Sequence, residues 1–142
     1  MLYCNLKGGL GNMLFQIAAV SSMAKDIGTE ASFPNLFRHL SYLNREGVCN
    51  PNLKHSMDYL SFLSPLRTQM PTTTLPTIGF PLHFEHKDVP LNCWVDGFFQ
   101  SEKYFAHNRV DILDLFLETD QMIGARKEYF SKDSKITISV HV

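Results

Sequence analysis

The sequence predicts an α/β protein with a partly parallel sheet and flanking helices. A short apolar run over residues 2–6 indicates a buried strand, and a glycine loop, Gly8-Gly9-Leu10-Gly11-Asn12, separates it from a helical pattern over residues 13–27. Residues 30–33 indicate a second short strand. Two strands joined through a helix usually lie parallel in one sheet, so a β-α-β unit is expected to open the chain.

The first helix is expected to pack one face inward. Its apolar positions fall together at about 100° per residue, and they are Met13, Ile17, Val20, Ala24 and Ile27. The other side carries Ser21, Ser22, Lys25 and Asp26. Asn12 is placed to cap the start of this helix, and Lys25 and Gly28 are the expected signals for its end.

Gln16 falls on the apolar side of this helix, beside Val20 and Ile27. A buried amide requires hydrogen-bond partners. Two interpretations stay open, because the side chain either braces the glycine loop or contacts a ligand.

The rest of the chain changes character at residue 93. All seven prolines lie within residues 34–90, which predicts a loop-rich region with a short helix over residues 57–63 and an edge strand over residues 78–84. Residues 93–99 indicate a clearer strand, in which Gly97 allows close approach of backbone or ligand. Ser101 is expected to cap a short helix carrying Tyr104 and Phe105.

Two further helices and a strand are predicted after this segment. Asn108 is expected to cap a helix over residues 109–117, and Thr119 begins the next one. The apolar stripe of the helix over residues 109–117 comprises Ile112, Leu113, Phe116 and Leu117. Residues 136–142 alternate between apolar and polar side chains as a strand does.

The composition is that of an ordinary globular domain, with 44% hydrophobic and 19% charged residues among 142. A net charge of −1 gives no reason to expect nucleic acid or an anionic membrane as a partner. Three cysteines without a Cys-x-x-Cys pair indicate neither a disulfide framework nor a zinc site. Without a signal peptide or a spanning segment in the chain, we expect a cytoplasmic protein, with peripheral attachment to a membrane left open.

The histidines indicate no clear site. His83 and His86 lie three residues apart on the predicted edge strand and would point to opposite faces, which disfavours shared metal binding. His39, His55 and His107 lie in polar stretches where a solvated surface role is expected.

The glycine loop is the leading candidate site. It aims backbone N–H groups and the positive end of a helix dipole at one point, which suits a phosphate, carboxylate or sugar oxygen. Leu14 stands where a dinucleotide fingerprint needs a third glycine, and no Gly-Lys-Ser/Thr follows, so NAD and ATP motifs are not supported. A tight turn and a binding loop both stay open. The candidate residues are Gly8, Gly9, Leu10, Gly11, Asn12 and Gln16. Asn12 is either a plain cap or a residue that takes part in catalysis.

Three sequence blocks together resemble one enzyme family. They are GGLGNMLFQ at residues 8–16, GFFQSEKYF at residues 97–105 and SVHV at residues 139–142. In order and character they are similar to the α-1,2-fucosyltransferases of glycosyltransferase family eleven. That family carries a Gly-Gly-Leu-Gly-Asn-Gln loop, a Gly-Tyr-Phe-Gln-Ser segment before a Tyr-Phe pair, and a His-x-Arg-x-Gly-Asp motif. Met13 stands where the family has glutamine, and Val142 is the last residue before the motif arginine would follow.

The resemblance implies a GT-B enzyme with two Rossmann-like domains facing across a cleft. Such an enzyme transfers L-fucose from GDP-fucose to the 2-hydroxyl of a terminal galactose with inversion, and uses no metal or other cofactor. Residues 1–134 would form the N-terminal domain, and residues 135–142 the first strand of a donor-binding domain, with His141 near the substrate. The implied partners are GDP-fucose, a galactose-terminated glycan, and the remaining domain or a second copy of the chain.

The resemblance therefore implies a fucosyltransferase fragment that is inactive alone, because the arginine to which the family assigns diphosphate binding is not among the 142 residues. Two alternatives stay open. One is a non-catalytic remnant or module that binds a sugar or a partner chain, and the other is a transferase of another nucleotide sugar.

Overall fold

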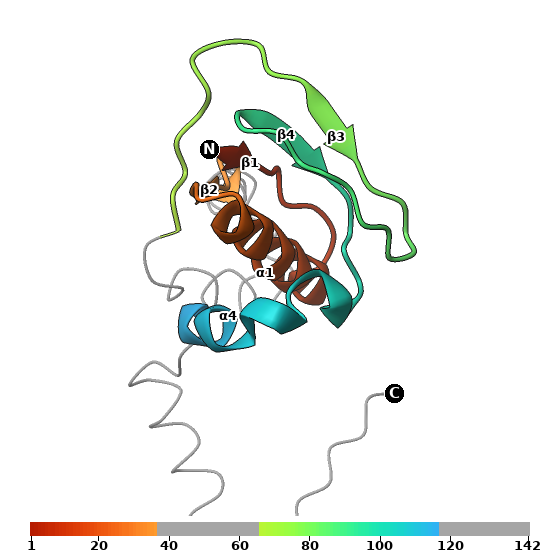
Figure 1. The fold of residues 1–142 in the computed structure, drawn as a ribbon. Helices are drawn as coiled ribbons and strands as arrows, with labels where there is room; N and C mark the ends of the chain where they lie inside the picture. The colour runs from red at the N-terminus through yellow and green to blue at the C-terminus, as the bar shows by residue number, and fades with distance from the viewer. Residues whose placement is uncertain (37–65, 117–142) are drawn as a thin grey trace, which may run out of the picture.

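The computed structural model describes residues 1–36 and 66–116 of the chain (Figure 1). Several predictions fall outside these residues: the helix over 57–63, the helix after Thr119, the strand over 136–142, the position of His141 and the domain boundary after residue 134.

A parallel sheet forms the centre of the described part of the chain. Its strands are β1 (Leu2–Tyr3), β2 (Ala31–Ser32), β3 (Thr77–Gly79) and β4 (Cys93–Asp96). They lie in the order β2-β1-β4-β3, and all three pairings are parallel. An isolated parallel bridge between Ser32 and Arg67 continues the sheet beyond β2. The prediction of an α/β protein with parallel strands is confirmed, and the predicted edge position of β3 is confirmed with it.

The strands are shorter than predicted, and side chains explain why β1 does not extend to Leu6. The backbone N–H and C=O of Leu6 bond the side-chain amide of Asn35, and those of Lys7 bond Gln16, so neither residue pairs with a neighbouring strand. At the end of β4 the chain turns away through Phe99, whose φ is 53°. β3 ends at Gly79 rather than continuing to residue 84.

The first helix, α1 (Leu10–Asp26), begins three residues before the predicted start. Gly9 is its N-cap residue, with an extended backbone and no side-chain hydrogen bond, so the prediction that Asn12 caps the helix is wrong. Glycine is among the residue types that are common at the N-cap position. At the other end Gly28 has a φ of 65° and its N–H donates to the carbonyl of Lys25, which confirms the predicted stop.

The packing of α1 against the sheet follows the predicted face. Met13, Ile17, Val20 and Ala24 are all buried. Ser22 was expected on the polar side and is instead fully buried. The reason is a second layer of chain over α1, which gives the Ser22 hydroxyl a hydrogen-bond partner in Asn108 at 3.0 Å.

That second layer consists of η1 (Glu102–Tyr104), η2 (Ala106–Asn108) and α4 (Arg109–Leu115), which run alongside α1 in Figure 1. Successive contacts show that the two segments run in the same direction. Gln100 bonds Asn12 near the start of α1, the rings of Phe105 and Phe15 lie 6.0 Å apart, and Asp111 pairs with Lys25 near its end. The side chain of Lys25 lowers the pKa of Asp111, chiefly through their hydrogen bond.

The caps of this layer agree only in part with the sequence. Ser101 is the N-cap of η1 and accepts a hydrogen bond from the N–H of Lys103, as predicted. Asn108 precedes α4, but its side chain donates to Ser22 and Asp26 rather than capping the helix. It ties the second layer to α1 instead.

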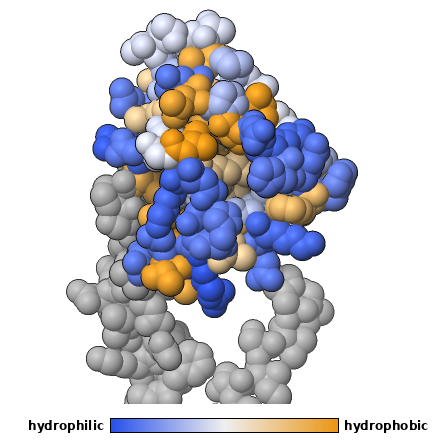
Figure 2. Space-filling view, in the orientation of Figure 1, coloured by the Kyte–Doolittle hydropathy of each residue, from blue (hydrophilic) through white to orange (hydrophobic). Residues whose placement is uncertain are grey.

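The core lies between the sheet and α1, and its largest fully buried side chains include Phe33, Phe99, Leu2, Leu6, Ile17, Val20 and Val95. On α4 the predicted stripe is wrong for Leu113, which is 51% exposed, while Ile112 is buried. Figure 2 shows the resulting surface on one face, with apolar patches set among mostly polar residues. No helix within the described ranges is long and apolar enough to cross a membrane.

Candidate functional site

The candidate site lies at the carboxyl edge of the sheet, where β1 and β4 are neighbours. From β1 the chain passes through α1 to β2 on one side, whereas β4 and β3 lie on the other side. The segments that follow β1 and β4 therefore start side by side at this edge. In open parallel sheets, ligands bind in the crevice outside the carboxyl ends of the strands. Both the glycine loop after β1 and the segment after β4 begin there.

Gly8 makes the turn out of β1 possible. Its φ is 84°, and a Cβ at this position would lie 2.6 Å from Nδ2 of Asn12. Gly9 and Gly11 differ, because a Cβ on either would meet no atom within 4 Å. Internal packing therefore explains Gly8 only. The open space beside Gly9 and Gly11 allows another molecule to approach the backbone closely.

Within the described residues, neither an N-cap side chain nor an acidic residue of the first turn offsets the positive dipole end at the start of α1. The N-cap side-chain hydrogen bond is lacking, and no acidic residue occupies the first turn. The N–H of Met13 bonds the carbonyl of Gly9, and the N–H groups before it belong to the unsatisfied first turn of the helix. This arrangement favours a negatively charged or strongly accepting oxygen in front of the loop.

Asn12 lies inside the first turn of α1, and its side chain joins two distant parts of the chain. Nε2 of Gln100 donates to Oδ1 of Asn12 at 2.6 Å. The glycine loop and the segment after β4, which the sequence singled out separately, therefore meet at one point. A catalytic role for Asn12 stays a prediction.

The hydrogen bonds of Gln16 confirm the interpretation that this side chain braces the glycine loop. Its side chain is fully buried, its Oε1 accepts from the N–H of Lys7 at 3.0 Å, and its Nε2 donates to the carbonyl of Lys7 at 2.8 Å. Asn35 holds Leu6 through the same pair of bonds, at 2.8 and 2.7 Å. Two amides thus fix the backbone of two consecutive residues, Leu6 and Lys7, that lead into the loop. Contact between Gln16 and a ligand stays a prediction.

Lys7 places a positive charge beside the glycine loop. Its Nζ lies 2.5 Å from Oδ1 of Asp96 and 5.0 Å from the centre of the Phe98 ring. Asp96 is the last residue of β4, so the ion pair bridges the ends of the two neighbouring strands. The sequence drew attention to neither Asp96 nor Asn35, since polar residues at strand ends are common and only the topology brings these side chains to the loop.

The segment after β4 stores backbone strain close to this contact. Phe99 is fully buried with a φ of 53°, a region that bulky residues rarely occupy. Gly97 is required here, because a Cβ would lie 2.9 Å from both Phe80 and Phe99. The N–H of Ser101 bonds the carbonyl of Phe99 at 2.7 Å and closes the turn around Gln100. Strain of this kind, of order 1–3 kcal/mol, concentrates at functional sites.

Two other groups among the described residues are unsuited to nucleophilic chemistry. Burial raises the pKa of the Cys4 thiol to about 12, with a further increase from Asp96 and an opposing effect from Lys7. Such a thiol is not ionised near neutral pH. Ser22, His107 and Asp26 lie together, but the serine and the carboxylate both face Nε2 of the histidine, at 3.5 and 2.9 Å. A catalytic triad needs them on opposite ring nitrogens.

The structure places the other predicted residues as follows. Leu10 is partly buried at the start of α1, beside the candidate site, and His141 lies outside the described residues. His83 and His86 are not on a strand, and His107 is paired with Asp26 rather than purely solvated. Within residues 1–36 and 66–116, no group of His, Cys, Asp and Glu side chains is placed to hold a metal ion.

A scan against protein-family models, a search of curated proteins and a search of solved structures each found no match to this chain.

Proposed function

We propose that the chain is the N-terminal, Rossmann-like part of a GT-B α-1,2-fucosyltransferase. The complete enzyme would transfer L-fucose from GDP-fucose to the 2-hydroxyl of a terminal galactoside with inversion and without a metal. One observation carries the proposal. The resemblance rests on residues 8–16 and 97–105, and the bond between Asn12 and Gln100 brings these two blocks together at the edge where parallel sheets bind ligands.

The strand order supports the Rossmann-like assignment. The Arg67 bridge, β2, β1 and β4 follow one another as neighbours. If the Arg67 bridge stands for the third strand, this run matches the 3-2-1-4 strand order of a dinucleotide-binding fold, and the strand labelled β3 is added at the edge. GT-B enzymes use two such domains, so the proposal requires a second one to supply most donor contacts.

The chemistry of the loop suits this reaction. Transfer breaks the bond between the fucose anomeric carbon and the phosphate oxygen while the galactose hydroxyl attacks from the opposite face. Negative charge develops on the leaving GDP, and a metal-free site neutralises it with cations and N–H donors. The open first turn of α1 supplies such N–H donors, and the amides of Asn12 and Gln100 are suited to orient sugar hydroxyls.

A second candidate, a non-catalytic module that binds sugar at the same loop, is favoured by one observation. Inverting transfer needs a base that removes the proton of the acceptor hydroxyl. Asp96 is the carboxylate beside the glycine loop in the described part of the chain, and it is already paired with Lys7. The base would then come from residues outside the described ranges.

A transfer assay separates the two candidates. The chain is joined to the donor-binding domain of a known α-1,2-fucosyltransferase, and GDP-fucose binding to that domain is verified first. Fucosylated lactose with an α-1,2 linkage is the expected product, and Asn12→Ala is expected to reduce turnover well beyond its effect on folding. The exposed residue Leu82 provides the control variant Leu82→Ala. A fusion that binds GDP-fucose and lactose but forms no product supports the binding module instead.

A further inference from the structure

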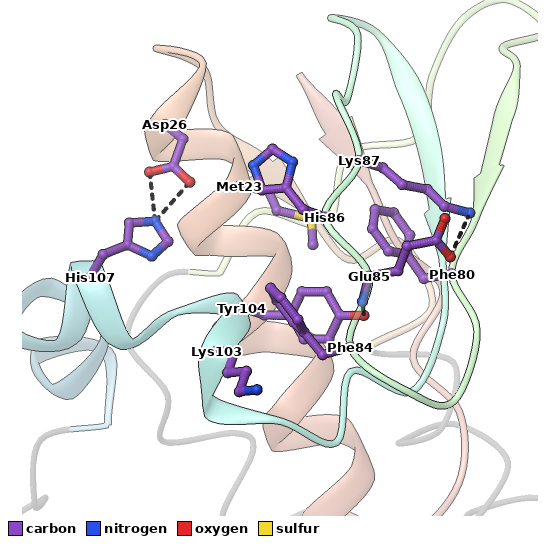
Figure 3. Close-up of a pocket in the computed structure, with 10 residues that line it drawn as sticks. All are labelled: Met23, Asp26, Phe80, Phe84, Glu85, His86, Lys87, Lys103, Tyr104 and His107. Carbon is purple, nitrogen blue, oxygen red and sulfur yellow. Dashed lines mark hydrogen bonds and ion pairs between the residues drawn. The ribbon is translucent and has the colours of Figure 1, made fainter.

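We propose that the chain has a saccharide-binding site, separate from the glycine loop, in the cavity shown in Figure 3. The cavity has a volume of about 350 Å³ and lies between the last two turns of α1, the segment after β3, and η1 and η2. It shares no lining residue with the glycine loop. The proposal does not depend on the proposed transferase activity. The ligand is a single pyranose ring, because the volume of this cavity lies at the small end of the range for ligand pockets.

An exposed aromatic ring provides the stacking surface. Phe84 is 38% exposed at the cavity, and its ring centre lies 4.8 Å from that of the buried Tyr104. The Tyr104 hydroxyl accepts a hydrogen bond from the N–H of Glu85 at 3.1 Å and donates to the carbonyl of His83 at 3.3 Å. These two bonds hold the segment that carries Phe84, so its ring is positioned before any ligand arrives. The apolar C–H face of a pyranose packs well on such a ring.

The polar groups around this ring offer both donors and acceptors. Asp26 and His107 stand on one side of the cavity in Figure 3, and the His86 ring and the Lys103 ammonium stand on others. Within the described residues neither His86 nor Lys103 Nζ has a hydrogen-bond or ion-pair partner, and Lys103 Nζ lies 5.6 Å from the centre of the Phe84 ring. Sugar hydroxyls both donate and accept, so a mixed rim of this kind satisfies them.

The charges around the cavity favour a neutral ligand. Its two ammonium groups, Lys87 and Lys103, are balanced by two carboxylates, Asp26 and Glu85. Lys87 also lies 3.5 Å from Glu85, so its charge is offset locally. The two carboxylates would repel an anionic ligand, and the two lysines would repel a cationic one. An uncharged polyhydroxylated ring is subject to neither repulsion.

NMR titration of the 142-residue chain tests the site. The probes are the methyl glycosides of β-galactose, α-glucose and α-mannose, with guanosine and benzoate as planar and anionic comparisons. At least one glycoside is expected to shift the amide signals of residues 84–87 and 103–107. Phe84→Ala and Phe84→Leu are expected to weaken that binding about tenfold, whereas Phe84→Tyr retains it. Leu82→Ala is the control, because this side chain is 72% exposed and does not line the cavity.

Several results would overturn the proposal. They are the absence of shifts at these residues with every glycoside, unchanged affinity in a folded Phe84→Ala or Phe84→Leu variant, and stronger binding of guanosine or benzoate than of any glycoside. Glycoside shifts confined to the glycine loop would also overturn it while leaving the transferase proposal intact. Shifts at the cavity alone would support this site and count against the loop.

Discussion

The side-chain amide of Gln100 donates a 2.6 Å hydrogen bond to Oδ1 of Asn12, across 88 positions of sequence. It joins the first turn of α1 to the strained turn that follows β4. Because Phe99 holds its unfavourable backbone conformation next to Gln100, the contact depends on the buried packing of Phe99 as well as on the two amides.

The hydrogen bond between Asn12 and Gln100 predicts that the effects of their substitutions on stability are coupled. Asn12→Ala and Gln100→Ala are each expected to lower the free energy of unfolding by about 1 kcal/mol, the net value of one ordinary hydrogen bond. The double variant is expected to cost little more than either single one, because both remove the same bond. Urea denaturation of the four proteins measures the coupling, and strictly additive losses would show that the bond does not form in solution.

The glycines of the loop are expected to respond in opposite ways to alanine. Gly8→Ala forces a positive φ and a clash with Asn12, so it should destabilise the fold by about 1–3 kcal/mol. Gly11→Ala is in open space within α1 and should stabilise it by about 0.5–1 kcal/mol.

Thermal unfolding measures both effects, and ligand titration adds the functional comparison. If Gly11 leaves room for a ligand, Gly11→Ala raises stability and weakens sugar binding in the same protein. A variant that is more stable and binds equally well would mean that this space is not used.

Gln16 is expected to be the most sensitive polar residue of the fold. Gln16→Met retains the volume but leaves the N–H and C=O of Lys7 without the amide they bond, at an expected cost of about 2–5 kcal/mol. Gln69→Met is the matched control at an exposed glutamine, where a change within about 0.5 kcal/mol is expected. Chemical denaturation of both variants checks this, and equal effects would refute the bracing role.

Because of Cys4, we expect the free energy of unfolding to decrease at high pH. Its pKa rises from 9.0 to about 12 in the folded chain, so the folded state retains a proton that the unfolded state releases. The stabilising contribution is complete below pH 9 and is lost as the pH rises toward 12, with a limiting slope of about 1.4 kcal/mol per pH unit. Cys4→Ala should remove this alkaline slope, measured by denaturation at stepped pH. Peptide mapping after iodoacetamide treatment should find Cys4 unmodified until the protein unfolds.

The sequence predicted the part of the fold that depends on local patterns. The order of strand, glycine turn and helix, the end of α1 at Gly28 and the cap at Ser101 follow from periodicity and from residues with strong backbone preferences. Local patterns misplaced the start of α1, because a glycine N-cap leaves no side-chain signal and Asn12 is the stronger capping residue by type.

Long-range contacts account for what the sequence did not reveal. Ser22 is polar and lies on the expected solvent side, yet η2 covers it and Asn108 bonds it. The partners Asp96 and Asn35 reach the glycine loop only because β4 and β2 flank β1. Neither spacing nor composition encodes which strands become neighbours. The glycine loop could therefore be predicted from the sequence, whereas the residues that surround it could not.

The most direct test of the central claim is an NMR titration of the 142-residue chain with lactose, read at the amides of Gly9, Leu10 and Gly11 and at the side-chain amide of Gln100. We predict saturable shifts at these positions that Asn12→Ala and Gln100→Ala weaken, with no comparable shifts from maltose or from GDP-fucose alone. A folded chain whose loop signals stay unmoved by lactose would contradict the assignment of this loop to the substrate site of the proposed transferase.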